Sequence, residues 1–183
     1  MQWHKTFLTV FAAGLILVGC ENLTFNQEPQ AQFSIGLITG LGGVTEPCGC
    51  TSKPLGGLDR MAGLVSEKTR GNAFGLIFVG DTFYELENPP GHLVQQEHEK
   101  AQAIAQVLGK LEPIAVLPGG RDLEVGVDRV PGFTQSFGLP ILSGLRGPSK
   151  ERFKADSALQ TVAGHKVGII GIAGDDSAGQ AEA

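Results

Sequence analysis

The chain has 183 residues, with 14 Lys and Arg against 19 Asp and Glu, so its formal net charge is −5 at pH 7. It contains one Trp, one Tyr and no run of basic residues, so it lacks the basic and aromatic surface that nucleic-acid-binding proteins use. The composition therefore argues against nucleic acid as a partner, and the length suits one ordinary domain.

Residues 1–19 are predicted to be a secretory signal peptide rather than part of the fold. After a weakly positive start, the apolar run from Thr6 to Val18 is too short to span a bilayer as a helix. The run closes in Leu17-Val18-Gly19-Cys20, which resembles the lipobox of bacterial lipoproteins. The resemblance implies cleavage before Cys20 and a lipid on that cysteine. The alternative is a plain signal peptide or anchor that happens to end in a cysteine.

A lipid on Cys20 predicts a protein that is anchored to a membrane of the bacterial cell envelope. Glu21 stands where lipoproteins retained at the inner membrane carry aspartate, so the outer membrane, facing the periplasm, is the expected location. Residues 20–32 are polar without periodicity and are predicted to be a flexible tether.

The pattern of apolar residues after the tether predicts an α/β domain over residues 33–174, followed by a disordered tail at 175–183. Helices are expected at 57–68 and 93–110 and in a short stretch near Asp122. Strands are expected at 33–39, 74–79, 113–117 and 139–143, and a hairpin is expected from 159–162 and 166–172. The order predicts a largely parallel sheet flanked by helices, with a C-terminal β-hairpin, and strand 33–39 is expected to be buried.

Three glycine-bearing loops follow strands of this predicted sheet, at residues 40–57, 80–83 and 118–122. In open parallel sheets, ligands bind beyond the carboxyl ends of the strands. The three loops are therefore predicted to meet at one rim.

The order of motifs resembles the N-terminal catalytic domain of one phosphoesterase family. The motifs are a Gly-Gly-Leu-x-Arg helix start at Gly56, a strand ending Val-Gly-Asp-Thr-Phe at Phe83, a glycine turn at Gly119, and Gly-x-Lys-Val-Gly-Ile-Ile-Gly at Gly164. They resemble the 5′-nucleotidase and UDP-sugar hydrolase branch of the calcineurin-like metallophosphoesterases. The resemblance implies a partial metallophosphoesterase sandwich and a centre of two divalent metals, Mn or Zn, that activates water for phosphoester hydrolysis.

The family's metal ligands are matched at one position of this chain. Asp81 corresponds to the metal-bridging aspartate, so the resemblance implies a role for it as a metal ligand. The family's Asp-x-His falls on Gly40-Leu41-Gly42, and its Asn and catalytic His fall on Gly120 and Arg121. The later histidine motifs would lie beyond Ala183. We therefore predict a largely degenerate metal site without catalytic residues, because a shared fold does not confer activity.

Cys48-Gly49-Cys50 lies in the first of the three loops and adds chemistry that the family pattern lacks. Two cysteines in an exported protein suggest a strained disulfide across one residue, active in thiol redox exchange. They also suit a thiolate metal site, which would need further ligands such as Asp81 or His92. The third interpretation is an inert disulfide, or unreactive thiols, that stiffen the loop.

Two charged residues at the rim also have functional and structural interpretations. Arg121 is a candidate for binding an anion, and otherwise is a solvated charge. Asp81 is a candidate metal ligand, and otherwise accepts backbone N–H groups in a turn.

These observations lead to one main functional prediction and two alternatives. The main prediction is a lipid-anchored envelope protein whose Cys48–Cys50 loop serves in thiol redox, metal binding or partner binding. A protein or a small phosphoester is the expected partner, besides the membrane. The first alternative is an active metal-dependent nucleotidase, completed by further C-terminal sequence or by a partner. The second is a purely structural or interaction lipoprotein.

Overall fold

The computed structural model describes residues 32–47, 49, 56–71, 73–145 and 148–173. Its contacts divide the chain into Met1–Ala31 and Gln32–Ala183, and all described residues belong to the second unit. Cys20, Cys48 and Cys50 lie outside the described residues. Within the described part, no helix combines the length and the apolar character needed to cross a membrane.

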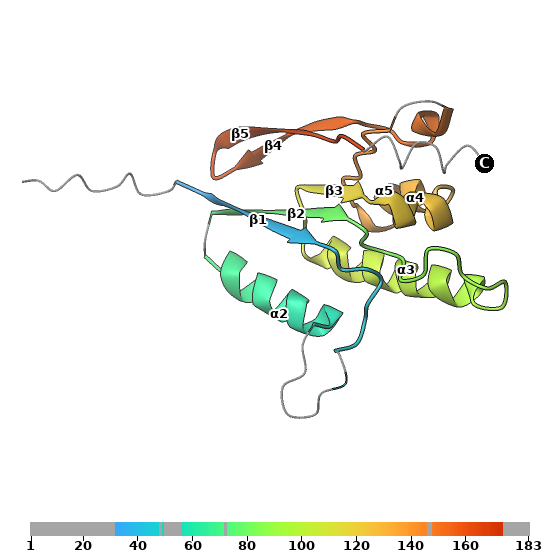
Figure 1. The fold of residues 1–183 in the computed structure, drawn as a ribbon. Coiled ribbons are helices and arrows are strands. Elements are labelled where there is room, and N and C mark those ends of the chain that lie inside the picture. Colours follow the sequence, from blue (N-terminus) through green and yellow to red (C-terminus); the bar gives the residue numbers. More distant parts are fainter. Residues whose placement is uncertain (1–31, 48, 50–55, 72, 146–147, 174–183) are drawn as a thin grey trace, which may run out of the picture. The chain divides into compact units, whose positions relative to one another are not determined.

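A parallel sheet of three strands forms the centre of the described unit (Figure 1). Its order is β1-β2-β3, with β1 at Ser34–Thr39, β2 at Phe74–Gly80 and β3 at Ala115–Pro118. Strand β2 lies in the middle, and Leu76, Ile77 and Phe78 are buried on both of its faces. This explains its nearly continuous apolar sequence, as is usual for a strand covered on both sides.

The two long helices lie along one face of the sheet (Figure 1). The bounds are α2 at Leu58–Thr69, α3 at Val94–Lys110, α4 at Gly120–Gly126 and α5 at Phe133–Phe137, with 3-10 turns η1 at Val130–Gly132 and η2 at Pro148–Arg152. In α3, the residues that recur at helical spacing are fully buried: Ala101, Ile104, Ala105 and Leu108. They share a core with Leu76 and Phe78 of β2.

A β-hairpin covers the other face of the sheet. It consists of β4 at Ser157–Val162 and β5 at His165–Ile170, which pair antiparallel. Ile169 packs with Ile77 of β2 and Ala115 of β3 in a second, smaller core. The α/β architecture with a parallel sheet, flanking helices and a C-terminal hairpin is therefore confirmed.

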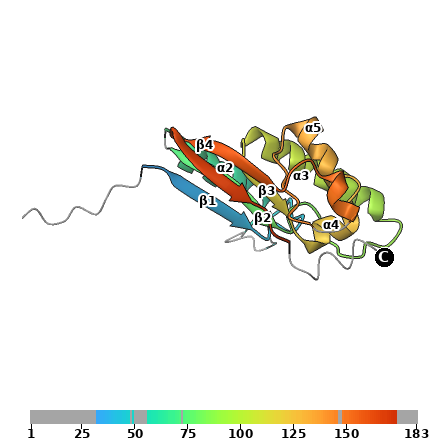
Figure 2. The same cartoon turned by 90° about the horizontal axis from the view of Figure 1, so that it is seen from above.

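Strand β1 is an exposed edge strand, so the prediction that it is buried is wrong. The side chain of Leu37 is 64% exposed, and the hairpin leaves β1 uncovered when the molecule is viewed from above (Figure 2). An apolar run at an edge looks the same in sequence as one in the centre. The predicted strand at 139–143 is likewise reduced to one parallel bridge, from Ile141 to Val116 of β3.

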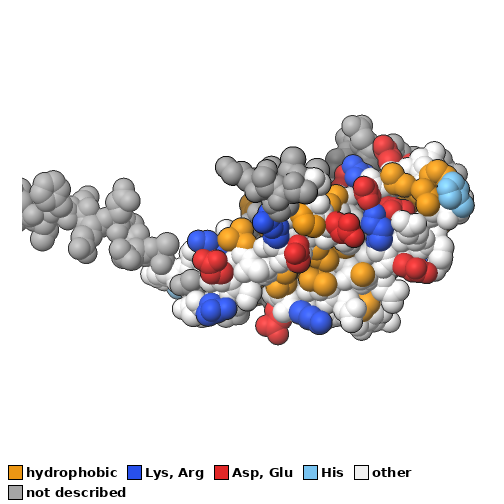
Figure 3. All heavy atoms as spheres, turned by 90° about the horizontal axis from the view of Figure 1, so that it is seen from below, with side chains coloured by type: hydrophobic (Ala, Val, Ile, Leu, Met, Phe, Trp, Pro, Cys, Tyr) orange, Lys and Arg blue, Asp and Glu red, His pale blue; other side chains and the backbone are white. Residues whose placement is uncertain are grey.

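The surface on the side of α2 and α3 carries both signs of charge. Acidic and basic side chains are interspersed there, with apolar side chains between them (Figure 3). No extended basic patch is visible in this view, in keeping with the acidic overall composition.

Candidate functional site

The described parts of the three glycine-bearing loops meet at the carboxyl end of the sheet, as predicted. The N–H of Gly42 donates to the carbonyl oxygen of Asp81 at 2.8 Å, and the N–H of Gly43 donates to that of Thr82 at 3.2 Å. The backbone N–H of Arg121 donates to Oδ1 of Asp81 at 2.9 Å. The loop after β2 is therefore bound on one side by the loop after β1 and on the other by the start of α4.

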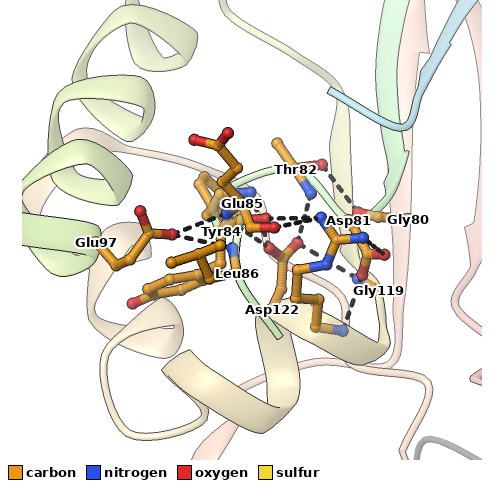
Figure 4. Close-up of polar contacts among 11 residues, drawn as sticks. Gly80, Asp81, Thr82, Tyr84, Glu85, Leu86, Glu97, Gly119 and Asp122 are labelled. Carbon is orange, nitrogen blue, oxygen red and sulfur yellow. Dashed lines mark hydrogen bonds and ion pairs between the residues drawn. The ribbon is translucent and has the colours of Figure 1, made fainter. Parts of the chain in front are cut away.

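The carboxylate of Asp122 binds the backbone of the loop after β2. Its carboxylate is fully buried and accepts the backbone N–H groups of Thr82 at 2.8 Å, Phe83 at 2.8 Å and Tyr84 at 3.1 Å (Figure 4). It also accepts the N–H of Gly119, at 3.4 Å, across the first turn of α4. One carboxylate thus satisfies donors from two loops, which is how buried carboxylates are tolerated.

Burial raises the pKa of Asp122 to about 6, against an ordinary value of 3.8. The N–H groups of Thr82, Phe83, Tyr84 and Gly119 favour the ionised form, but they offset only part of the effect of burial. The folded protein therefore binds the Asp122 proton more tightly than the unfolded chain does. The stability that this proton contributes is fully present below about pH 4 and is lost as the pH rises through about 6.

This linkage predicts a specific difference between the wild-type chain and Asp122→Asn. Because asparagine does not titrate, the stability advantage of wild type over the variant should shrink as the pH rises from about 4 to about 6. The measurement is urea unfolding of both proteins at several pH values. Other acids, such as Glu97, are present in both proteins and cancel in the difference. An advantage that grows with pH across this window would contradict the raised pKa.

Glu97 binds the same loop from α3. Its Oε2 accepts the N–H groups of Glu85 at 3.0 Å and Leu86 at 3.2 Å (Figure 4). Lys100 pairs with Oε1 of Glu97 at 3.1 Å and also with the carboxylate of Glu85. Burial opposes ionisation of Glu97, but these N–H groups and Lys100 outweigh it, so the pKa of Glu97 is lowered. The N–H groups of five consecutive residues, Thr82 to Leu86, are therefore bound by two carboxylates.

Tyr84 anchors the loop by its side chain. The ring is fully buried, and its hydroxyl lies 3.0 Å from Nδ1 of His98 on α3. Burial raises the pKa of Tyr84 and lowers that of His98, so both groups are neutral near pH 7. Gly126 makes room for this ring, because a Cβ atom there would lie 2.3 Å from it.

Asp81 and Arg121 are brought together at the rim, as their positions after neighbouring strands implied. Oδ2 of Asp81 lies 3.6 Å from Nη2 of Arg121, and both side chains are 31% exposed. Nη1 of Arg121 donates to the carbonyl oxygens of Glu85 at 2.9 Å and Tyr84 at 3.4 Å. Arg121 therefore binds the loop after β2 instead of projecting freely into solvent.

The sequence interpretation missed Asp122, Glu97 and Tyr84. One local signal pointed to Asp122: it lies three residues after Gly119, where an acidic side chain can bind the N–H of the residue that starts a helix. Nothing in the sequence near Glu97 or Tyr84 indicates their partners in the loop.

The described residues at the rim do not fit a centre of two metals. Guanidinium groups are always charged and donate only, so Arg121 cannot act as a ligand and repels cations from Asp81. Among the described residues, no three His, Cys, Asp or Glu side chains gather closely enough to hold a metal. Cys48 and Cys50 lie outside the described residues, so their metal and redox interpretations remain predictions.

Comparison with known proteins supports the fold. A scan of family models finds no match, and a search of curated proteins finds none either. Among solved structures, the chain is similar to the 5′-nucleotidase precursor from Thermus thermophilus, with 24% identity and a TM-score of 0.59. The match covers 78% of this chain and 29% of that one, so the chain spans less than a third of the length of this neighbour. The matched part of the chain therefore has a fold similar to that of the corresponding part of this 5′-nucleotidase precursor.

Proposed function

We propose that the chain is a lipid-anchored envelope protein whose metallophosphoesterase-like domain has lost two-metal hydrolysis. The observation that carries this proposal is the pairing of Asp81 with Arg121. Asp81 is the residue that corresponds to the family's metal-bridging aspartate, and its carboxylate already has a cationic partner from its own chain. The Cys48-Gly49-Cys50 loop then serves in thiol redox exchange, metal binding or binding of a partner protein.

An assay of metal-dependent hydrolysis tests this proposal. The full chain, supplied with Mn²⁺ or Zn²⁺ and a nucleoside monophosphate, is expected to release no more phosphate than Asp81→Ala does. The reason is that Asp81, the described residue at a ligand position of the family, is already paired with Arg121, whereas two-metal chemistry requires several free ligands. Asp128→Ala is the matched control, because Asp128 is an exposed acid that pairs with Arg152. Metal-dependent hydrolysis that Asp81→Ala abolishes and Asp128→Ala preserves would overturn the proposal.

An active phosphoesterase is the second candidate function. Two observations favour it: Asp81 lies at the carboxyl end of β2, and the 5′-nucleotidase neighbour is much longer than the matched part. In this case, additional sequence or a partner protein supplies the missing ligands. The same assay, repeated with the candidate partner present, separates the two functions. If the protein keeps its function after both Cys48 and Cys50 are replaced by serine, a structural or interaction lipoprotein is favoured instead.

A further inference from the structure

Three oxygen atoms surround the guanidinium group of Arg121. They are Oδ2 of Asp81 at 3.6 Å from Nη2, and the carbonyl oxygens of Tyr84 and Glu85 at 3.4 Å and 2.9 Å from Nη1. All three belong to residues 81–85, and we call them the oxygen cradle. Since a guanidinium group carries its donors in a planar fork, one group can serve acceptors in several directions at once.

The oxygen cradle is held in place by bonds that do not involve the Arg121 side chain. Asp122 binds the N–H groups of Thr82, Phe83 and Tyr84, and Glu97 binds those of Glu85 and Leu86. The loop after β1 fixes the carbonyl groups at positions 81 and 82. The cradle is therefore expected to keep its shape when the Arg121 side chain is removed.

The geometry of the cradle suits an organic cation better than a metal ion. Calcium takes six to eight oxygen ligands at about 2.3–2.6 Å, and magnesium requires near-octahedral geometry at about 2.0–2.1 Å. The cradle provides one carboxylate oxygen and two carbonyl oxygens, all at hydrogen-bonding or ion-pair distances from nitrogen. Two neutral acceptors and one anionic acceptor complement a single, delocalised positive charge.

We propose that the oxygen cradle is a guanidinium-binding site that the chain fills with its own Arg121. Free guanidinium ion binds there once the Arg121 side chain is removed. The inference rests on the proposed function in one respect, namely that the rim of Asp81 takes an organic cation rather than a divalent metal.

Rescue of Arg121→Ala by guanidinium tests the site. The variant should unfold about 2–4 °C below wild type in a chain of this size, because it loses the two hydrogen bonds and the partly exposed ion pair of the Arg121 side chain. Guanidinium chloride at up to about 20 mM, too dilute to denature, should restore at least half of the loss. Sodium chloride at equal ionic strength should not. The ¹³C resonances of the Tyr84 and Glu85 carbonyl groups should move back toward their wild-type positions during the titration.

Arg152→Ala is the matched control. Arg152 pairs with one exposed carboxylate, that of Asp128, so its removal leaves no cradle. Guanidinium should therefore not stabilise this variant or wild type. Arg121→Lys gives a second readout if Arg121→Ala folds poorly, because lysine keeps the charge but lacks the planar fork. Guanidinium should shift the Tyr84 and Glu85 carbonyl resonances of Arg121→Lys toward their wild-type positions and leave those of Arg152→Ala unchanged.

The outcomes separate this inference from the proposed function. Equal stabilisation of Arg121→Ala and Arg152→Ala, or none of either, overturns the guanidinium site. Stabilisation of Arg121→Ala by Mn²⁺ or Ca²⁺ but not by guanidinium also overturns it, because the cradle would then be a metal site. The titration uses no substrate and no hydrolysis, so metal-dependent activity of wild type would refute the proposed function without deciding whether the cradle binds guanidinium.

Discussion

Replacing Asp122 by alanine is expected to lower the free energy of unfolding by about 3–5 kcal/mol, the range for breaking a buried carboxylate network. The substitution leaves four backbone N–H groups, at Thr82, Phe83, Tyr84 and Gly119, without their acceptor. Each buried donor that loses its partner costs about 1–3 kcal/mol, although neighbouring costs do not simply add. Urea unfolding at pH 7 measures the loss.

Asp128→Ala is the control for that experiment, because Asp128 is exposed and pairs with Arg152. Its unfolding free energy should stay within about 0.5 kcal/mol of wild type, as is usual for surface ion pairs. If Asp122→Ala were no more destabilising than Asp128→Ala, the role of Asp122 as the support of the loop would be refuted. In Asp122→Ala, amide resonances of Phe83 and Tyr84 that move far from their wild-type positions would show that the loop after β2 loses its structure.

Gly43→Ala is expected to destabilise the fold by about 2–5 kcal/mol, through a backbone collision and a strained backbone conformation together. A Cβ atom at Gly43 would lie 2.3 Å from the backbone nitrogen of Glu85, and the residue has φ of +69°. The collision would push the loop after β1 away from the loop after β2 and break the bond from Gly43 to Thr82. Chemical unfolding again provides the measurement.

Gly40→Ala separates the two causes. Gly40 has nearly the same backbone conformation, with φ of +62°, but a Cβ atom there would meet nothing within 4 Å. It should therefore cost only the conformational penalty, about 1–2 kcal/mol, partly offset by the stiffer unfolded chain. The excess loss in Gly43→Ala over Gly40→Ala measures how closely the two loops approach. Equal losses of unfolding free energy in the two variants would mean that the close approach of the two loops does not contribute to stability.

Much of the fold was predictable because it depends on local patterns. The spacing of Ala101, Ile104, Ala105 and Leu108 identifies α3, and the apolar run from Phe74 to Val79 identifies β2. The parallel order then implies that the loops after the strands meet, which brings Asp81 and Arg121 to one rim. The exposure of β1 was not predictable, because a strand's place in a sheet depends on which other segments pair with it.

The supports of the rim were beyond the reach of sequence patterns. Asp122 binds residues about 40 positions earlier in the chain, and Glu97 binds residues 11 and 12 positions earlier. The sequence does not show which backbone N–H a carboxylate will bind, because every residue except proline provides the same donor. The role of Arg121 was missed for a related reason. Two of its three partners are carbonyl groups, at Tyr84 and Glu85, that any residue would present.

The two carboxylates beneath the loop after β2 also change its expected dynamics. Irregular segments are usually where proteases cut first and where solvent deuterium enters first, because their amide groups face water. Here the amide hydrogens from Thr82 to Leu86 are held by Asp122 and Glu97, which are anchored in α4 and α3. Opening this segment requires breaking its bonds to two buried carboxylates, so its amide hydrogens are expected to exchange more slowly than those of an ordinary loop.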